Sequence, residues 1–310
     1  MKAMKELNFK QQMYVDETLM KDIKALEKTC YEHESVALKL EVAYKYAVYL
    51  DQKDDDVQRS SFESNEFMCY DGDKLVGYIG ISGFGGYDLE LNGMVHPDYR
   101  RQGIFTALHE RVKTELNKRH SSEVLLLSDA NSRWGQYFIE QCGGIYQKSE
   151  FEMVADLSQF RLTESEAKLI FKKATNADKA EIDLQNAIYF SDETGVDSEN
   201  EPASEEITVM PEDEEKRGFL IYLAHLGHDV VGKVNIQLLS SEGGIYGLGI
   251  KPEYRGRGLG RSLLLQAMDI IQKNSLPMAM LQVEAENETA LTLYKSCGFI
   301  TRSTMKYYAL

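Results

Sequence analysis

The feature that most constrains this chain is an internal repeat, in which the second half matches the first half at a constant offset of 155 residues. Pro97-Asp-Tyr-Arg100 aligns with Pro252-Glu-Tyr-Arg255, and Cys142-Gly143 aligns with Cys297-Gly298. A repeat of about 150 residues has the size of one ordinary domain and is far longer than a solenoid unit. The sequence therefore predicts two tandem copies of one domain.

Strand-like and helical segments follow the same order in both copies. Residues 16–50 have helical periodicity, and residues 66–81 have the pattern of a hairpin, as do residues 219–238 in the second half. Strands mixed with helices and hairpins indicate an α/β fold of the α+β type, in which a mixed, mostly antiparallel central sheet is flanked by helices. We place the first domain at residues 1–160 and the second at residues 161–310.

Composition limits the location and the partners of the chain. With 310 residues, 43% of them hydrophobic, the chain is long enough for two cores. It has no apolar run of transmembrane length, no signal-peptide core and no Cys-x-x-Cys, which predicts a cytoplasmic protein without a membrane segment. The net charge of −15 argues against nucleic acid as a partner.

A glycine-rich turn lies between a strand-like run, residues 244–250, and an apolar helix that starts near Ser262. Glycines and basic residues alternate in it, namely Gly256, Gly258 and Gly260 with Lys251, Arg255, Arg257 and Arg261. Glycines allow a ligand to approach the backbone, and a helix start carries unpaired N–H groups. Alternatives are a plain tight turn and a solvated basic face. The combination favours a site for a pyrophosphate.

This turn resembles the signature of the GNAT superfamily of N-acetyltransferases, Arg/Gln-x-x-Gly-x-Gly/Ala after a strand, here Arg255-x-x-Gly258-x-Gly260. Asn287 and Tyr294 in the later segment agree with the family. The spacing differs from the dinucleotide fingerprint Gly-x-Gly-x-x-Gly, and no Gly-Lys-Ser/Thr follows as in a nucleotide P-loop. The resemblance covers nearly the whole chain and is weakest in the first 65 residues.

The resemblance implies acetyl-CoA as co-substrate, no metal, and direct attack of a primary amine on the thioester. The CoA-binding residues that it implies are Leu248, Gly249, Ile250, Arg255, Gly256, Arg257, Gly258, Leu259, Gly260, Arg261 and Asn287. In this resemblance Tyr294 corresponds to the general acid of the family. A tyrosine can have this role, since a hydroxyl with an ordinary pKa of about 10 can protonate a leaving thiolate. The alternative for Tyr294 is a packed helix tyrosine.

The general base is open between several groups. Glu284, on the strand before Asn287, is the first candidate, and Glu242 is another. The tandem layout is similar to that of the mycothiol synthase family, whose C-terminal half is catalytic, but the position of its glutamate base corresponds here to Gly244. A water relay to Glu284 or to a backbone carbonyl is a further alternative.

The first half departs from the family at two positions. The offset places Phe105 on Gly260 and Ile139 on Tyr294, and isoleucine cannot donate a proton. We therefore expect catalysis in the C-terminal domain and a degenerate N-terminal domain that either holds CoA or buttresses its neighbour through packing within the chain. The alternative from another class is a catalytically silent CoA-binding or regulatory module. The oligomeric state is left open.

The acceptor is expected to be a small molecule or peptide with a primary amine. Residues 192–215 contain eleven Asp or Glu and no Lys or Arg, in the region where the family forms its acceptor site. This run is either a solvated loop, which we favour, or an attractor for a cationic amine. His225 and His228 lack further ligands nearby and do not indicate zinc. Trp134 and Tyr137 are expected to be packing groups.

Overall fold

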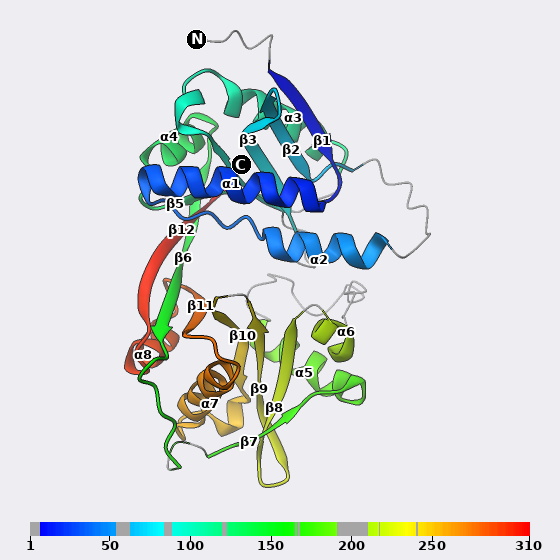
Figure 1. Ribbon diagram of the computed structural model, residues 1–310. Coiled ribbons are helices and arrows are strands. Elements are labelled where there is room, and N and C mark those ends of the chain that lie inside the picture. Colours follow the sequence, from blue (N-terminus) through cyan, green and yellow to red (C-terminus); the bar gives the residue numbers. More distant parts are fainter. Residues whose placement is uncertain are drawn as a thin grey trace, which may run out of the picture. The chain divides into compact units, whose positions relative to one another are not determined.

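The structure is a computed structural model in which two compact units can be distinguished (Figure 1). Unit 1 contains Met1–Ser149 and Ser303–Leu310, and unit 2 contains Glu150–Arg302. The structure describes residues 7–53, 63–83, 89–119, 123–164, 166, 168–190, 210–216, 218–239 and 241–310.

Unit 1 is a mixed sheet with helices on both faces. Its strands are β1 (Asn8–Gln12), β2 (Glu66–Asp71), β3 (Lys74–Ser82), β4 (Leu89–Val95), β5 (Val124–Asp129), and parts of β6 (Ile145–Asp156) and β12 (Ile300–Ala309). Its helices are α1 (Glu17–Glu34), α2 (Val42–Lys53), α3 (Ile104–Leu116), α4 (Arg133–Gln141) and the short 3-10 helix η2 (Pro97–Tyr99). Of the pairings β1–β2, β2–β3, β3–β4, β4–β5 and β5–β12, that of β4 with β5 is parallel and the others are antiparallel. One core lies between this sheet and α3, and another lies under α1.

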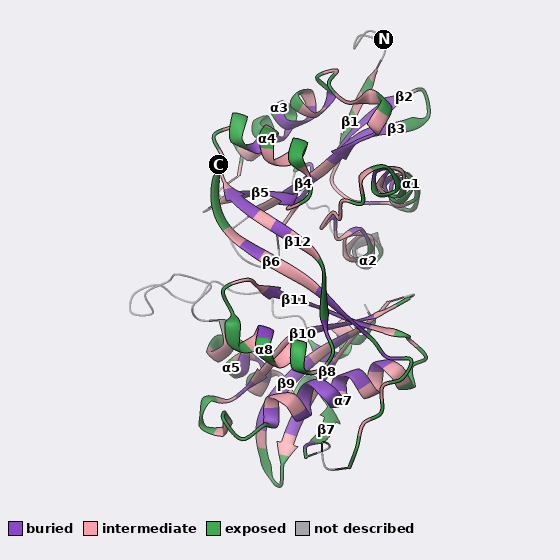
Figure 2. Ribbon diagram, turned by 90° about the vertical axis from the view of Figure 1, so that its left-hand side faces the viewer, coloured by how far each residue is buried: buried purple, intermediate pink, exposed green. Residues whose placement is uncertain are grey.

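Unit 2 repeats this plan. Its strands are β7 (Ile170–Lys173), β8 (Phe219–Leu226), β9 (Asp229–Leu238), β10 (Gly243–Ile250), β11 (Met278–Glu284) and part of β6. Its helices are α5 (Lys179–Phe190), α6 (Pro211–Lys216), α7 (Leu259–Lys273), α8 (Glu288–Ser296) and the 3-10 helices η3 (Asn176–Asp178) and η4 (Pro252–Tyr254). Among the described strands of this unit, β10 pairs with β11 in parallel, and the pairings β6–β11, β10–β9, β9–β8 and β8–β7 are antiparallel. The apolar face of α7 is buried in the largest core (Figure 2).

The sequence repeat and the compact unit are different sets of residues, because the last strands are exchanged. Strand β6 ends the first repeat, yet its residues 150–156 pair with β11. Strand β12 ends the second repeat, yet its residues 305–309 pair with β5. The predicted α/β fold, with a mixed, mostly antiparallel sheet flanked by helices, is confirmed. Each unit obtains one strand from the other repeat.

One packing expectation is wrong. Trp134 is 58% exposed and Tyr137 is 54% exposed. Both lie on α4, where only Ile139 is buried, and their rings contact each other edge to face with centroids 6.3 Å apart. The helix is so short that one buried residue anchors it, and its two large aromatic residues remain exposed.

Candidate functional site

The glycine-rich turn of unit 2 presents an open helix start. Gly256 has φ +75° and Gly258 has φ +74°, a conformation that strains residues with a Cβ. A Cβ on Gly256 would meet no atom within 4 Å, so conformation rather than crowding requires this glycine. Gly258 caps α7 without a side-chain hydrogen bond. The first N–H groups of α7 are therefore available to a bound anion.

Two of the predicted cationic residues have different roles in this turn. The Nε of Arg255 donates to the carbonyl oxygen of Ile250 at 2.9 Å, and in unit 1 the Nε of Arg100 donates to Val95 at 3.0 Å. This arginine therefore closes the turn in both units. Arg257 is exposed, donates to the Glu253 carbonyl oxygen at 3.0 Å, and remains accessible to a ligand.

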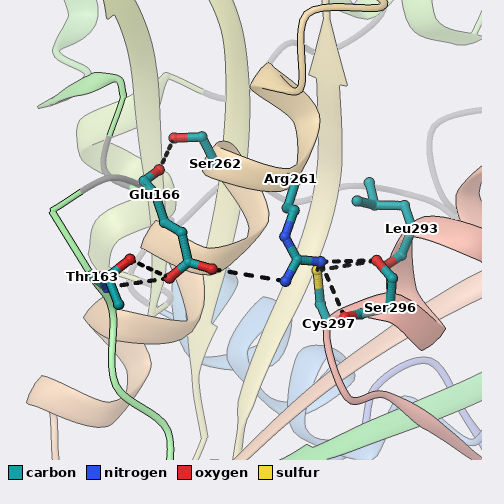
Figure 3. Close-up of polar contacts among 7 residues, drawn as sticks. All are labelled: Thr163, Glu166, Arg261, Ser262, Leu293, Ser296 and Cys297. Atoms are coloured by element: carbon teal, nitrogen blue, oxygen red, sulfur yellow. Dashed lines mark hydrogen bonds and ion pairs between the residues drawn. The ribbon is translucent and has the colours of Figure 1, made fainter.

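Arg261 joins three segments beside the turn (Figure 3). One of its terminal nitrogens donates to the carbonyl and hydroxyl oxygens of Ser296 at 3.0 and 2.9 Å, and the other lies 3.8 Å from a carboxylate oxygen of Glu166. The Ser262 hydroxyl donates to the Glu166 carbonyl oxygen at 2.6 Å. These contacts attach α7 to α8 and to the chain before β7.

The attached segment brings Lys168 to the helix start. Its backbone N–H donates to the Ser262 hydroxyl oxygen at 3.0 Å, and its Nζ lies 3.8 Å from the Cβ position of Gly258. Sequence reasoning missed this cation because it lies 90 residues before Gly258 and outside any motif. Lys251, which was expected near the anion, instead pairs with Glu181 at 2.7 Å.

One edge of β10 is open where the thioester is expected. Strands β10 and β11 pair only from Gly243 to Ile245. Farther on, the Lys251 N–H donates to the carbonyl oxygen of Val231 in β9 at 2.9 Å. Since N–H groups alternate between the two edges of a regular strand, that of Ile250 points away from β9. This predicted strand residue therefore places a donor at the open edge.

A β-bulge at this place distinguishes unit 2 from unit 1. Tyr246 is paired with Asn235, but the next pair is Gly249 with Lys233, so β10 contains an extra residue. Gly247 within the bulge has φ +53°. The corresponding strands β3 and β4 of unit 1 pair without a register shift. A bulge redirects backbone groups, which is how it serves many functional sites.

A second difference lies between the signature helix and the helix that follows β11. A Cβ on Gly260 would be in ordinary contact with Leu293 at 3.7 Å and Ile250 at 4.0 Å, so glycine leaves room there for about a methyl group. In unit 1 the matching Phe105 packs on Phe138 with ring centroids 4.7 Å apart. Aromatic rings thus occupy in unit 1 the space that glycine leaves in unit 2.

Tyr294 lies partly buried on α8, at the edge of the core of unit 2. Burial raises the pKa of its hydroxyl above 10, so it stays protonated at neutral pH. Its counterpart Ile139 is buried in unit 1. Asn287, also predicted as a CoA contact, caps α8 through its Oδ1, which accepts from the Ala290 N–H at 3.0 Å.

The candidate bases have unequal surroundings. Both carboxylate oxygens of Glu242 accept hydrogen bonds from Arg302, at 2.7 and 3.0 Å. At Gly244 a Cβ would be 2.5 Å from the ring of Tyr246, so that ring occupies the place of a side chain at 244. Glu284 is the last residue of β11 and is partly exposed.

Most of the acidic run lies outside the described residues, which resume at Met210. In α6, Glu212 accepts from the side-chain nitrogen of Asn176 at 3.1 Å, and Glu215 pairs with Lys173 at 2.7 Å. These carboxylates bind neighbours on the surface. Among the residues that the structure describes, no three metal-binding side chains gather, and no helix is long and apolar enough to cross a membrane.

Two family models match the chain. The model described as "Acetyltransferase (GNAT) family" matches residues 184–299, and the model described as "Acetyltransferase (GNAT) domain" matches residues 63–152. Mycothiol acetyltransferase from Streptomyces coelicolor is 28% identical over 259 residues, which cover 78% of each chain. Mycothiol acetyltransferase from Renibacterium salmoninarum is 39% identical over 79 residues, which are 26% of this chain and only 20% of that protein.

Solved structures of the same architecture span the whole chain. The "Tandem GNAT protein from the clavulanic acid biosynthesis pathway" has a TM-score of 0.72 at 13% identity, with 98% of both chains covered. The GCN5-related N-acetyltransferase from Sphaerobacter thermophilus has a TM-score of 0.71 at 18% identity, with 97% of this chain and 95% of that one covered. At such identities the likeness concerns the fold.

Proposed function

Because this chain belongs to the GNAT family of N-acetyltransferases and carries two of its domains, we propose that it transfers an acetyl group from acetyl-CoA to a primary amine in unit 2. Three differences between matched positions support this assignment of the chemistry. Unit 2 has the bulge in β10, the space at Gly260 and the hydroxyl of Tyr294. Unit 1 has a regular β4, the Phe105 ring and Ile139 at these places.

The proposed cofactor site follows from the exposed polar groups. The pyrophosphate is bound by the first N–H groups of α7, with Arg257 and Lys168 supplying positive charge beside them. The pantetheine arm lies along the open edge of β10. The space at Gly260 lets it pass between α7 and α8, and the Leu248 N–H donates to the thioester oxygen.

The reaction proceeds by direct attack. The amine nitrogen forms a bond to the carbonyl carbon, the C–S bond breaks, and the intermediate oxyanion accepts a hydrogen bond from the Leu248 N–H. The sulfur takes the proton of the Tyr294 hydroxyl, and the proton of the amine leaves through water toward Glu284. Proton exchange with solvent restores the tyrosine and the carboxylate.

The acceptor that we propose is a small molecule with a primary amine. Similarity to a protein named mycothiol acetyltransferase over 78% of this chain supports a small acceptor rather than a nucleic acid or a membrane. The residue at 244, however, is glycine here. Screening therefore starts from a panel of simple and sugar-borne primary amines.

The experiment copies the residue of unit 1 into unit 2. Gly260→Phe should abolish acetyl-CoA binding in calorimetry, whereas the control Phe105→Leu in unit 1 should leave affinity unchanged. Unaltered affinity in Gly260→Phe would refute the assigned site. Binding without release of CoA thiol over the whole amine panel would instead favour the silent CoA-binding module.

A further inference from the structure

The sheet of unit 2 contains a buried lysine that the mechanism above does not use. Lys233 lies on β9 and is 1% exposed. Burial, the only cause at work, lowers its pKa from 10.5 to about 8. Lysine is rarely buried without a paired charge, because desolvation of an ammonium is costly. The unusual burial of this lysine suggests that it has a role in the site.

The bulge in β10 lies directly against this ammonium. The Nζ of Lys233 is 3.4 Å from the carbonyl oxygen of Gly247, and it is 2.9 Å from the Cβ position of Gly247. A Cβ at 247 would require the tip of this lysine to shift, and the φ of +53° favours glycine here on its own. The extra residue of the bulge brings the Gly247 carbonyl group to Nζ.

The peptide that carries this carbonyl also carries the Leu248 N–H. In a trans peptide the C=O and the N–H point in opposite directions. The Gly247 oxygen faces Lys233, so the Leu248 N–H faces away from it. One peptide unit thus connects the buried ammonium to the open edge of β10.

We propose that Lys233 is a positioning residue for the acetyl-transfer reaction, which holds and polarises the Gly247–Leu248 peptide so that its N–H stabilises the thioester oxyanion. This inference rests on the proposed function of unit 2. A positive charge at the carbonyl oxygen strengthens the N–H of the same peptide as a donor, since hydrogen bonds in a chain polarise one another at low dielectric. The fixed charge needs no reorganisation during the reaction.

Among the residues that the structure describes, no carboxylate pairs with Lys233. Opposite Lys233 on β8 lies Leu223. From α5, the Tyr189 ring covers Gly249, and Glu181 is paired with Lys251 at 2.7 Å. From β10 come Tyr246 and the glycines of the bulge. Unit 1 has Tyr78 at the matching position, hydrogen-bonded to Glu66, together with a β4 that has no bulge.

The test uses the whole chain with acetyl-CoA labelled with carbon-13 at the thioester carbonyl. We expect the carbonyl resonance of the bound cofactor to move downfield in the wild type at pH 7, and to lose part of this displacement as the pH rises through about 8. Lys233→Met should show the smaller displacement at every pH. Lys233→Arg should retain it, and the exposed Lys273→Met is the matched control.

Kinetics supply the second measurement, with the first amine of the panel that is acetylated. Lys233→Met should lower kcat about 10-fold, less than the 10²–10³-fold loss of a whole oxyanion donor, with little change in the KM of acetyl-CoA. The wild type should lose activity above about pH 8, and the variant should not.

Several outcomes would overturn the inference. Equal carbonyl displacements in the wild type and Lys233→Met would remove the polarising role. A rate that rises through pH 8 only in the wild type would make Lys233 a proton acceptor instead. Neither of these two results would affect the proposed function of unit 2. The proposed function would be refuted if the wild type bound no acetyl-CoA.

Discussion

At the scale of single residues, Tyr294 and Ile139 are the sharpest contrast between the two repeats. Tyr294→Phe removes only the hydroxyl, so we expect kcat to fall by about 10²–10⁴-fold with a modest change in the KM of acetyl-CoA. Ile139→Val in unit 1 should leave kcat unchanged. Steady-state kinetics with a common acceptor measure both. Near wild-type turnover in Tyr294→Phe would mean that this tyrosine only packs.

The burial of the charged Lys233 side chain should lower the free energy of unfolding at neutral pH. Its pKa is about 8 in the folded state and 10.5 when unfolded, so below pH 8 the whole burial cost is present, about 3 kcal/mol. Between pH 8 and 10.5 the unfolded state binds more protons, and stability therefore rises with pH. We expect Lys233→Met to unfold at higher urea concentration than the wild type at pH 7, with the difference shrinking toward pH 10.5.

This result would separate the lysine from an ordinary structural residue. Replacement of a residue kept for packing usually lowers stability. If Lys233→Met unfolds at lower urea concentration at pH 7, the ammonium must have a stabilising partner, contrary to the surroundings described above.

At the scale of elements, the turn before the signature helix has the same conformation in both units. Gly103 has φ +81° and Gly258 has φ +74°. Alanine at either position should destabilise its unit by about 1–2 kcal/mol, the cost of a left-handed residue with a Cβ. Only Gly258→Ala should also weaken acetyl-CoA binding in calorimetry, because the proposed cofactor site lies in unit 2. Equal losses of affinity would place CoA in both units.

At the scale of the whole molecule, the exchanged strands should make the first repeat unable to fold alone. In a fragment of residues 1–160, β6 would have to replace β12 beside β5. The offset would place Glu150 and Glu152 where Met305 and Tyr307 are buried, at 7% and 2% exposure. Burying carboxylates in that apolar core is costly, and an uncovered edge of β5 invites aggregation.

The rescue variant makes this prediction specific. We expect the fragment to aggregate in size-exclusion chromatography, and the double change Glu150→Met with Glu152→Tyr to make it monomeric. A wild-type fragment that is monomeric and shows a cooperative thermal transition would contradict the argument.

The sequence by itself determined the repeat, the type of fold and the family. These depend on local patterns, such as the positive-φ glycines at 256 and 258 and the alternation of strands with helices, which the chain encodes next to each other. Tyr294 and Glu284 belong to the same local signal, and their catalytic roles stay predictions. Alignment of the two repeats also places Phe105 opposite Gly260, so this difference follows from the sequence alone.

Only the tertiary structure decided what lies far apart in the chain. The exchange of β6 and β12 was hidden because each strand ends its own repeat at the same place, and their partners depend on which core accepts their side chains. Lys168 reaches the turn through Ser262, and Lys233 reaches the bulge from the neighbouring strand. A lysine in a sequence is expected to be exposed to solvent. Only the packing of other residues around Lys233 buries its charge and lowers its pKa.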